Sequence, residues 1–171
     1  INQKIDFPFC SEISLYIKRE DLIHPIVSGN KFRKLKYNIL QAKKEKKSKI
    51  ITFGGAFSNH IAAVAFAAQE NNLECLGIIR GEELRDKIED NPTLLFAQKC
   101  GMQFEFVSRA SYRLKAEPSF IENLKHKYGD FYLVPEGGTN EFAVRGCEEI
   151  LSETDVDFDY VCCAVGTGGT I

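Results

Sequence analysis

A chain of 171 residues is long enough to bury a core, and 44% hydrophobic with 27% charged residues is typical of a globular protein. A formal net charge of −2 gives no electrostatic reason to expect nucleic acid or a membrane surface as a partner. Six cysteines without metal-binding spacing and no apolar run of membrane-spanning length predict a cytoplasmic protein that holds no metal.

The predicted elements alternate between strands and helices. A short strand at 13–19 and a loop at 23–30 come first, followed by a helix with Asn30 as its N-cap and Phe32 and Leu35 on one face. Buried strands are then expected at 50–53, 76–79, 103–107, 131–134 and 160–165, with helices at 58–69, 92–99, 118–128 and 141–151.

This alternation predicts an α/β fold with parallel sheets that are covered by helices on both faces. Ligands of such folds bind at the carboxyl ends of the strands, and the glycine pairs 54–55, 137–138 and 168–169 all follow predicted strands. No helix follows the last predicted strand to cover it. We therefore expect roughly a hundred or more further residues in the intact protein.

Lys31 lies in the first turn of a predicted helix, where the helix dipole opposes a cation by ~0.3–1 kcal/mol. Arg33 and Lys34 add further positive charge close by. Both effects favour the neutral amine, which is the form that condenses with a carbonyl group. By itself the same pattern also fits a solvated surface lysine.

A second pattern, Gly54-Gly55-Ala56-Phe57-Ser58-Asn59-His60, joins a predicted strand to a helix. The free backbone N–H groups of a helix N-terminus attract an anion, and Ser58 and Asn59 add a hydroxyl and an amide there. Simple helix capping by Ser58 or Asn59 explains the same residues. His60 could bind an anion, but a position on the helix surface is the simpler expectation.

A third pattern is Gly166-Thr167-Gly168-Gly169-Thr170, which follows an apolar run. Glycines allow positive φ angles, so successive N–H groups can converge on a phosphate, and the threonine hydroxyls add donors. The lysine of a P-loop is missing, and a plain tight turn is an equal alternative.

Taken together, these motifs resemble the fold-type II pyridoxal-phosphate (PLP) enzymes, the group related to the tryptophan synthase β chain. The segment from Gly29 to Leu35 is similar to the branch that holds 1-aminocyclopropane-1-carboxylate (ACC) deaminase and D-cysteine desulfhydrase. The motif ending in His60, the segment from Pro135 to Asn140 and the 166–170 loop match further motifs of that branch.

The resemblance implies PLP as the cofactor, bound covalently by Lys31 and hydrogen-bonded at its ring hydroxyl oxygen by Asn59. Ser58, Asn59 and His60 would receive the substrate carboxylate, and Ser58 would also take part in catalysis. The cofactor's phosphate would be held by the backbone of Gly166, Thr167, Gly168, Gly169 and Thr170.

The resemblance also implies two parallel open-sheet α/β domains with the cofactor cleft between them. Residues 48–138 would form the smaller domain, and 1–47 with 139–171 would form part of the larger one, whose second half is missing from this sequence. A homodimer is implied for the full-length protein.

The function implied by the resemblance is deamination of a small amino acid. His60 stands where ACC deaminases usually have Gln, which favours a D-cysteine desulfhydrase-like β-elimination giving a 2-oxo acid and ammonia. ACC deaminase proper is the alternative. Two readings of another kind are a catalytically inert PLP- or anion-binding homologue and, less well supported, a nucleotide-binding regulatory domain that uses the 166–170 loop.

Overall fold

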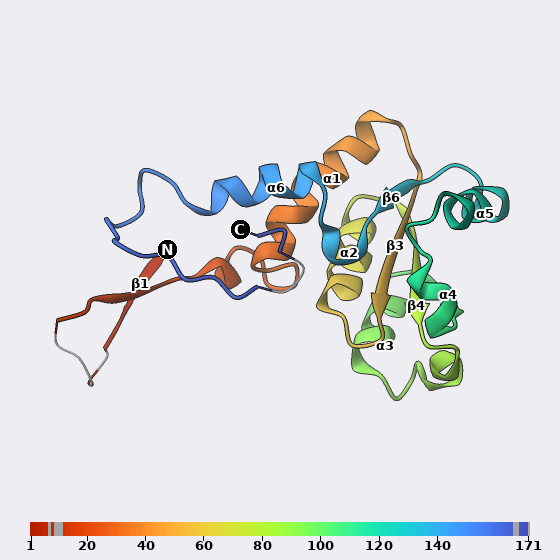
Figure 1. Ribbon diagram of the computed structural model, residues 1–171, viewed down its shortest axis with the longest axis horizontal. Coiled ribbons are helices and arrows are strands. Elements are labelled where there is room, and N and C mark those ends of the chain that lie inside the picture. The colour runs from red at the N-terminus through yellow and green to blue at the C-terminus, as the bar shows by residue number, and fades with distance from the viewer. Residues whose placement is uncertain (7, 9–11, 166–167, 171) are drawn as a thin grey trace.

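The computed structural model describes residues 1–6, 8, 12–165 and 168–170 (Figure 1). Its strands are β1 (Asn2–Ile5), β2 (Leu15–Lys18), β3 (Lys49–Gly55), β4 (Glu74–Arg80), β5 (Met102–Val107) and β6 (Tyr132–Val134). Its α-helices are α1 (Asn30–Lys44), α2 (Asn59–Glu70), α3 (Pro92–Lys99), α4 (Arg109–Arg113), α5 (Pro118–Tyr128) and α6 (Glu141–Cys147). Single 3₁₀ turns are η1 (Glu20–Leu22), η2 (Glu82–Lys87), η3 (Glu136–Gly138) and η4 (Glu148–Ile150).

The central feature is a four-stranded parallel sheet in the order β5-β4-β3-β6. The chain moves outward from β3 to β4 and β5 through α2 and α3, and then returns through α4 and α5 to place β6 on the other side of β3. The direction of winding therefore reverses between β3 and β6, as in a doubly wound sheet. The predicted α/β class with a parallel sheet is confirmed.

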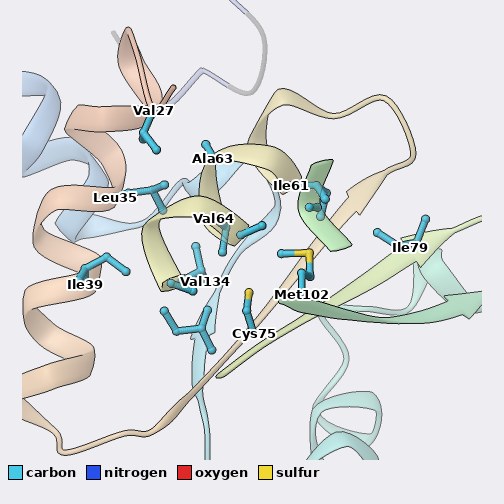
Figure 2. Packing of buried hydrophobic residues seen from close by; sticks show 14 of the residues in the cluster. Val27, Leu35, Ile39, Ile61, Ala63, Val64, Cys75, Ile79, Met102 and Val134 are labelled. Atoms are coloured by element: carbon cyan, nitrogen blue, oxygen red, sulfur yellow. The ribbon is translucent and has the colours of Figure 1, made fainter. Parts of the chain in front are cut away.

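Helices cover both faces of this sheet, and each face has its own apolar cluster. Side chains of β3 alternate between them, because successive residues of a strand point to opposite faces: Ile50 joins one cluster, and Ile51 and Phe53 join the other. Helices α1, α2 and α3 pack on the Ile50 side (Figure 2), and α4 and α5 pack on the Ile51 side.

Helix starts follow the local sequence. Asn91 caps α3 by accepting the Leu94 N–H at 2.9 Å, and Pro92 occupies the first turn, where its missing N–H costs no hydrogen bond. Pro118 plays the same part in α5. The helices predicted at 92–99 and 118–128 are confirmed, and the helix predicted from Ser58 begins one residue later with Ser58 as its N-cap.

The segments before and after the sheet pack against each other. Gly146 of α6 lies directly on the backbone carbonyl of Arg33 in α1, so that a Cβ atom at 146 would overlap that oxygen. The segment after η4 also contacts the N-terminal residues. Asp155 accepts hydrogen bonds from Lys18 (2.6 Å to Oδ2) and from the Asn2 side-chain amide (2.8 Å), which connects the antiparallel β1–β2 hairpin to this segment.

Some expectations are corrected. Residues 160–165, predicted as a buried strand, are exposed and form neither strand nor helix, because no strand among the described residues lies beside them to complete their backbone hydrogen bonds. The helix predicted at 141–151 ends at Cys147 and continues only as η4. Asn30 is the first residue of α1 and not its N-cap, which is Gly29.

The described residues contain one parallel sheet, which lies between Lys49 and Val134. A second parallel sheet and the division into domains at 48 and 138 stay predictions. Among the described helices, none has the length and apolar character needed to cross a membrane.

We predict that Gly146→Ala destabilises the protein. Replacing glycine by alanine inside a helix normally favours folding, but here the added methyl group overlaps the Arg33 carbonyl, and such overpacking costs about 1–3 kcal/mol. The urea midpoint of the full-length protein should fall. Val144→Ala, on the exposed side of the same helix, is the control and should shift the midpoint little; equal midpoints for the two variants would refute the close crossing.

Candidate active site

The reversal between β3 and β6 brings two loops to the same end of the sheet. Parallel strands have their carboxyl ends on one edge, so the loop that begins at Gly55 and the turn from Pro135 to Gly138 are neighbours there. This is where open α/β sheets bind ligands. Figure 1 shows that α1 approaches the same region from the side of α6.

The loop after β3 leads directly into α2. Ser58 caps this helix, because its Oγ accepts the backbone N–H of His60 at 3.2 Å. Asn59, the first residue of the helix, is exposed. Gly54 has to be glycine, since a Cβ atom there would collide with the side chain of Ile61. Ser58 thus has the capping role that the sequence allowed, at a helix N-terminus that also suits an anion.

The side chain of His60 is buried, 2% exposed, and does not lie on the helix surface as expected. The Thr52 hydroxyl donates its single hydrogen to the Val134 carbonyl at 2.9 Å, so His60 Nε2, 2.8 Å away, donates to Thr52 Oγ1. His60 Nδ1 is then an acceptor, and it has no hydrogen-bond partner among the described residues.

Burial, together with the nearby charges of Lys31 and Lys34, lowers the pKa of His60 to about 3. Its imidazole is therefore neutral at physiological pH. Gly138 lies beside this ring and the Lys34 side chain, and its φ of +76° is a conformation that residues with a side chain rarely adopt.

Lys31 is half-buried at the start of α1, and its Nζ lies 3.2 Å from Asn30 Oδ1. Burial lowers the pKa of this ammonium group, and the charge of Lys34 lowers it further. Arg33, which was expected to act in the same way, instead donates two hydrogen bonds to Glu20, at 2.8 and 3.1 Å. Its charge is compensated by that carboxylate.

The glycine loop lies against the start of α1. Asn30 donates from Nδ2 to Thr170 Oγ1 at 3.0 Å, so its side chain serves this loop and not the helix cap. Gly169 packs so closely on Thr139 that a Cβ atom at 169 would overlap that side chain. Gly166 and Thr167, predicted to hold a phosphate, lie outside the described residues.

Two further residues of this site, Lys34 and Thr139, were not assigned a role from the sequence. Lys34 is only 1% exposed, and its Nζ contacts Thr139 Oγ1 at 3.4 Å. Within the part of the chain that the structure describes, no carboxylate forms an ion pair with Lys34. The spacing of three residues from Lys31, which puts both on one face of a helix, was the available signal.

The Asn140 side chain has a structural role. It caps α6 by accepting the Ala143 N–H at 2.9 Å, and it exchanges hydrogen bonds of 2.7 and 3.1 Å with the buried amide of Asn38. These contacts fix Thr139, its neighbour in the chain, between α1 and α6.

The structure therefore brings Asn30, Lys31, Lys34, Thr139, His60 and residues 168–170 together through direct contacts and mutual charge effects. Ser58 and Asn59 belong to this group through the helix turn they share with His60. No group of three or more His, Cys, Asp or Glu side chains that could hold a metal occurs among the described residues.

The family model described as "Pyridoxal-phosphate dependent enzyme" matches residues 7–171. The mitochondrial bifunctional D-cysteine desulfhydrase/1-aminocyclopropane-1-carboxylate deaminase of Arabidopsis thaliana is 32% identical, over 92% of this chain and 43% of its own length. The D-cysteine desulfhydrase of Serratia proteamaculans is 26% identical, over 91% of this chain and 50% of its own length.

The fold comparison agrees. The crystal structure of an ACC deaminase homologue superimposes with a TM-score of 0.73 and 32% sequence identity, over 92% of this chain and 49% of that one. The chain spans about half the length of the curated relatives it matches. On the family match over nearly all of its residues, the chain belongs to the pyridoxal-phosphate-dependent enzymes.

Proposed function

We propose that the full-length protein is a PLP-dependent deaminase of a small amino acid that carries out a D-cysteine desulfhydrase-like β-elimination to a 2-oxo acid and ammonia. The observation that carries this proposal is the half-buried Lys31 amine, with its lowered pKa, next to a buried cation and a glycine loop. These are the groups that a phosphorylated aldehyde needs: a neutral amine for the carbonyl and a cationic, N–H-rich pocket for the phosphate.

The donor set supports a fit to the cofactor's phosphate. Lys34 presents a buried ammonium that lacks a carboxylate partner among the described residues, and Thr139 presents a hydroxyl beside it. Gly168, with φ of +82°, Gly169 and Thr170 add backbone N–H groups and a further hydroxyl. We propose that Lys34 and the 166–170 loop bind the phosphate and that Lys31 binds the aldehyde carbon.

When bound, the cofactor supplies an electron sink for the substrate's α-carbon. The protein supplies the proton transfers and the orientation. Once the substrate amine has taken its place, the Lys31 amine acts as the general base that removes the α-proton. The resulting ammonium then donates this proton to the sulfur that departs from the β-carbon of D-cysteine as hydrogen sulfide. Burial keeps this amine in its neutral form for a larger fraction of the time.

The start of α2 is the proposed site of the substrate carboxylate. Its helix N-terminus favours an anion, and Asn59 is exposed. The Ser58 oxygen accepts the His60 N–H, and its hydroxyl hydrogen has no acceptor among the described residues. We propose that Ser58, Asn59 and His60 receive the carboxylate, with the carboxylate replacing Ser58 Oγ as the acceptor of the His60 backbone N–H, and that Asn59 also reaches the ring hydroxyl of the cofactor. Catalysis by Ser58 is a further part of this proposal.

ACC deaminase proper is the second candidate, since the Arabidopsis relative carries both activities in its name. In either case we propose that the intact protein is a homodimer with a cytoplasmic location and an amino acid as its small-molecule partner. A third candidate, an inert homologue that binds PLP without turnover, is tested by the same experiment.

We predict that Lys31→Ala in the full-length protein abolishes the visible absorbance of bound PLP and the release of 2-oxo acid from D-cysteine, because no amine is left at this position to bond the cofactor or move the proton. Borohydride reduction of the wild-type protein followed by peptide mapping should place the cofactor on Lys31. Lys43→Ala, exposed at the far end of the same helix, should behave as wild type.

The three candidates give different results in this assay. Release of 2-oxo acid from ACC and not from D-cysteine would favour the deaminase proper, and a PLP-loaded protein without turnover of either would favour the inert homologue. Reduction of a different lysine would contradict the assignment of Lys31.

We predict that Lys34→Gln weakens PLP binding by about 10- to 100-fold, since a hydrogen bond to a charged group contributes about 1.5–3 kcal/mol. Equilibrium dialysis of PLP against the apoprotein measures the change, and inorganic phosphate should compete more weakly in the variant. Lys36→Gln, half a turn further along α1 and paired with Glu149, is the control. Equal PLP affinities in both variants would exclude Lys34 as a phosphate ligand.

We predict that His60 makes the protein less stable in acid. Its pKa is about 3 in the folded protein and 6.5 in its ordinary state, so the unfolded chain binds a proton that the folded one does not. The contribution of His60 to the free energy of unfolding is fully present above pH 6.5. It is lost as the pH falls toward 3, with a slope of up to about 1.4 kcal/mol per pH unit. In His60→Gln the urea midpoint should fall less between pH 7 and pH 5; parallel curves would contradict the burial.

A further inference from the structure

We propose that Glu20 is a positioning residue that fixes the backbone of Lys31 from both sides. The proposal rests on the role of Lys31 as the cofactor lysine. Glu20 begins the turn η1, eleven residues before Lys31 in the sequence, and none of its atoms needs to touch the cofactor. Its two polar groups, the backbone carbonyl and the carboxylate, hold two different points of the segment that contains Lys31.

The first point is Gly29, two residues before Lys31. Its backbone N–H donates to the Glu20 carbonyl at 3.0 Å. Gly29 has φ of +60° and ψ of −146°, a conformation that residues with a side chain rarely adopt, and its own carbonyl accepts the Phe32 N–H at 3.1 Å to open the helix. The position of the first turn of α1 therefore depends on where Glu20 holds Gly29.

The second point is Arg33, two residues after Lys31. Its Nε donates to Glu20 Oε2 at 2.8 Å and its Nη2 donates to Oε1 at 3.1 Å, which is the paired geometry that gives an Arg–carboxylate contact its directionality. Both side chains are largely shielded from solvent, with 18% and 16% of their areas exposed. The pair is thus screened less than a surface ion pair.

Further contacts hold the loop between Glu20 and Gly29 in a folded conformation. Between Glu20 and Gly29, His24 accepts the N–H groups of Ile26 and Val27 at its Nδ1 and packs its ring near Phe32 of α1. The loop therefore folds onto the helix, where Val27 joins the apolar cluster that contains Leu35, and the Glu20 carboxylate is the group that links this loop to the Arg33 side chain.

The adjacent pair Arg19–Asp21 shows the contrast. These residues flank Glu20 and also form an ion pair, at 2.7 Å, but Asp21 is 56% exposed and the pair joins residues only two apart. It makes no link to α1. Asp21 therefore provides a matched control: a carboxylate next to Glu20 in the chain whose removal leaves Gly29 and Arg33 in place.

For function, these contacts matter because they set the position and orientation of the Lys31 side chain. A reacting group displaced by about 1 Å can lose about 100-fold in rate even when its chemistry is unchanged. Without the Glu20 carboxylate, the bond to Gly29 remains but the link between η1 and Arg33 is weakened. The Arg33 side chain then keeps only its 3.3 Å contact with Glu149, so the segment that carries Lys31 is held less firmly on that side. Attachment of the cofactor and proton transfer should slow, while substrate binding at α2 should persist.

The experiment compares Glu20→Gln with Asp21→Asn in the full-length protein. For Glu20→Gln we expect kcat and the rate at which added PLP gives its visible band to fall about 10-fold or more, with KM within about twofold of wild type. Asp21→Asn should match wild type in all three. A readout independent of activity is hydrogen exchange at the Gly29 and Phe32 amides of the apoprotein, which should speed up in Glu20→Gln alone.

If Glu20→Gln does not fold, the double variant Glu20→Gln/Arg33→Gln, which also removes the cation that has lost its Glu20 partner and keeps only its 3.3 Å contact with Glu149, is measured against the same criteria. Equal rates and equal exchange in the Glu20 and Asp21 variants would overturn this inference while leaving the proposed function intact. Borohydride labelling of another lysine in the wild-type protein would instead overturn the proposed function.

Discussion

The arrangement of the site depends on one buried ammonium group, that of Lys34. Removing a charge from water costs several kcal/mol unless a partner of opposite charge or good hydrogen bonds replace the lost hydration. Among the described residues only the Thr139 hydroxyl is in hydrogen-bond contact with Lys34 Nζ. An anion held between Lys34 and the glycine loop would meet that need, which is why the proposed phosphate site accounts for both the lysine and the loop.

The parallel sheet explains how distant segments reach this point. The reversal between β3 and β6 puts the Ser58 loop and the Pro135–Gly138 turn side by side, and Gly138 lies next to His60 of α2 and Lys34 of α1. The close crossing at Gly146 then presses α6 against α1 and sets Thr139 beside Lys34. The site is thus assembled from three loops and two helices whose positions are set by packing.

Local chemistry made much of the fold predictable. Pro92, Pro118 and Ser58 set helix starts that need no tertiary information, and the strands of the sheet are short apolar runs between turns. The run at 160–165 has the same apolar character but is exposed, because a strand exists only beside a partner and the sequence of the run does not show one. The short helix α4 was missed, since five residues carry too little periodicity.

The site was predictable where a motif marks it and not where burial decides. Lys31 and Ser58 stand in recognisable patterns. Lys34 looked like one more cation near Lys31, and only the packing of α1 against η3 and α6 shows that it is buried. Arg33 was expected to raise the local positive charge, but Glu20, 13 residues earlier, compensates it. His60 was expected at the surface, and its contact with Thr52 reverses that expectation.

The pairing of the first strand with the last described loop has a consequence for the order of folding during synthesis. The hydrogen bond between Asn2 and Asp155 spans 153 residues, and the contact between Arg33 of α1 and Gly146 of α6 also joins distant parts of the chain. The βαβ units in the middle close over much shorter distances and can form as they leave the ribosome. The segment with Lys31 must wait for residues near 170, so a nascent chain would acquire its cofactor pocket late, after its sheet is already in place.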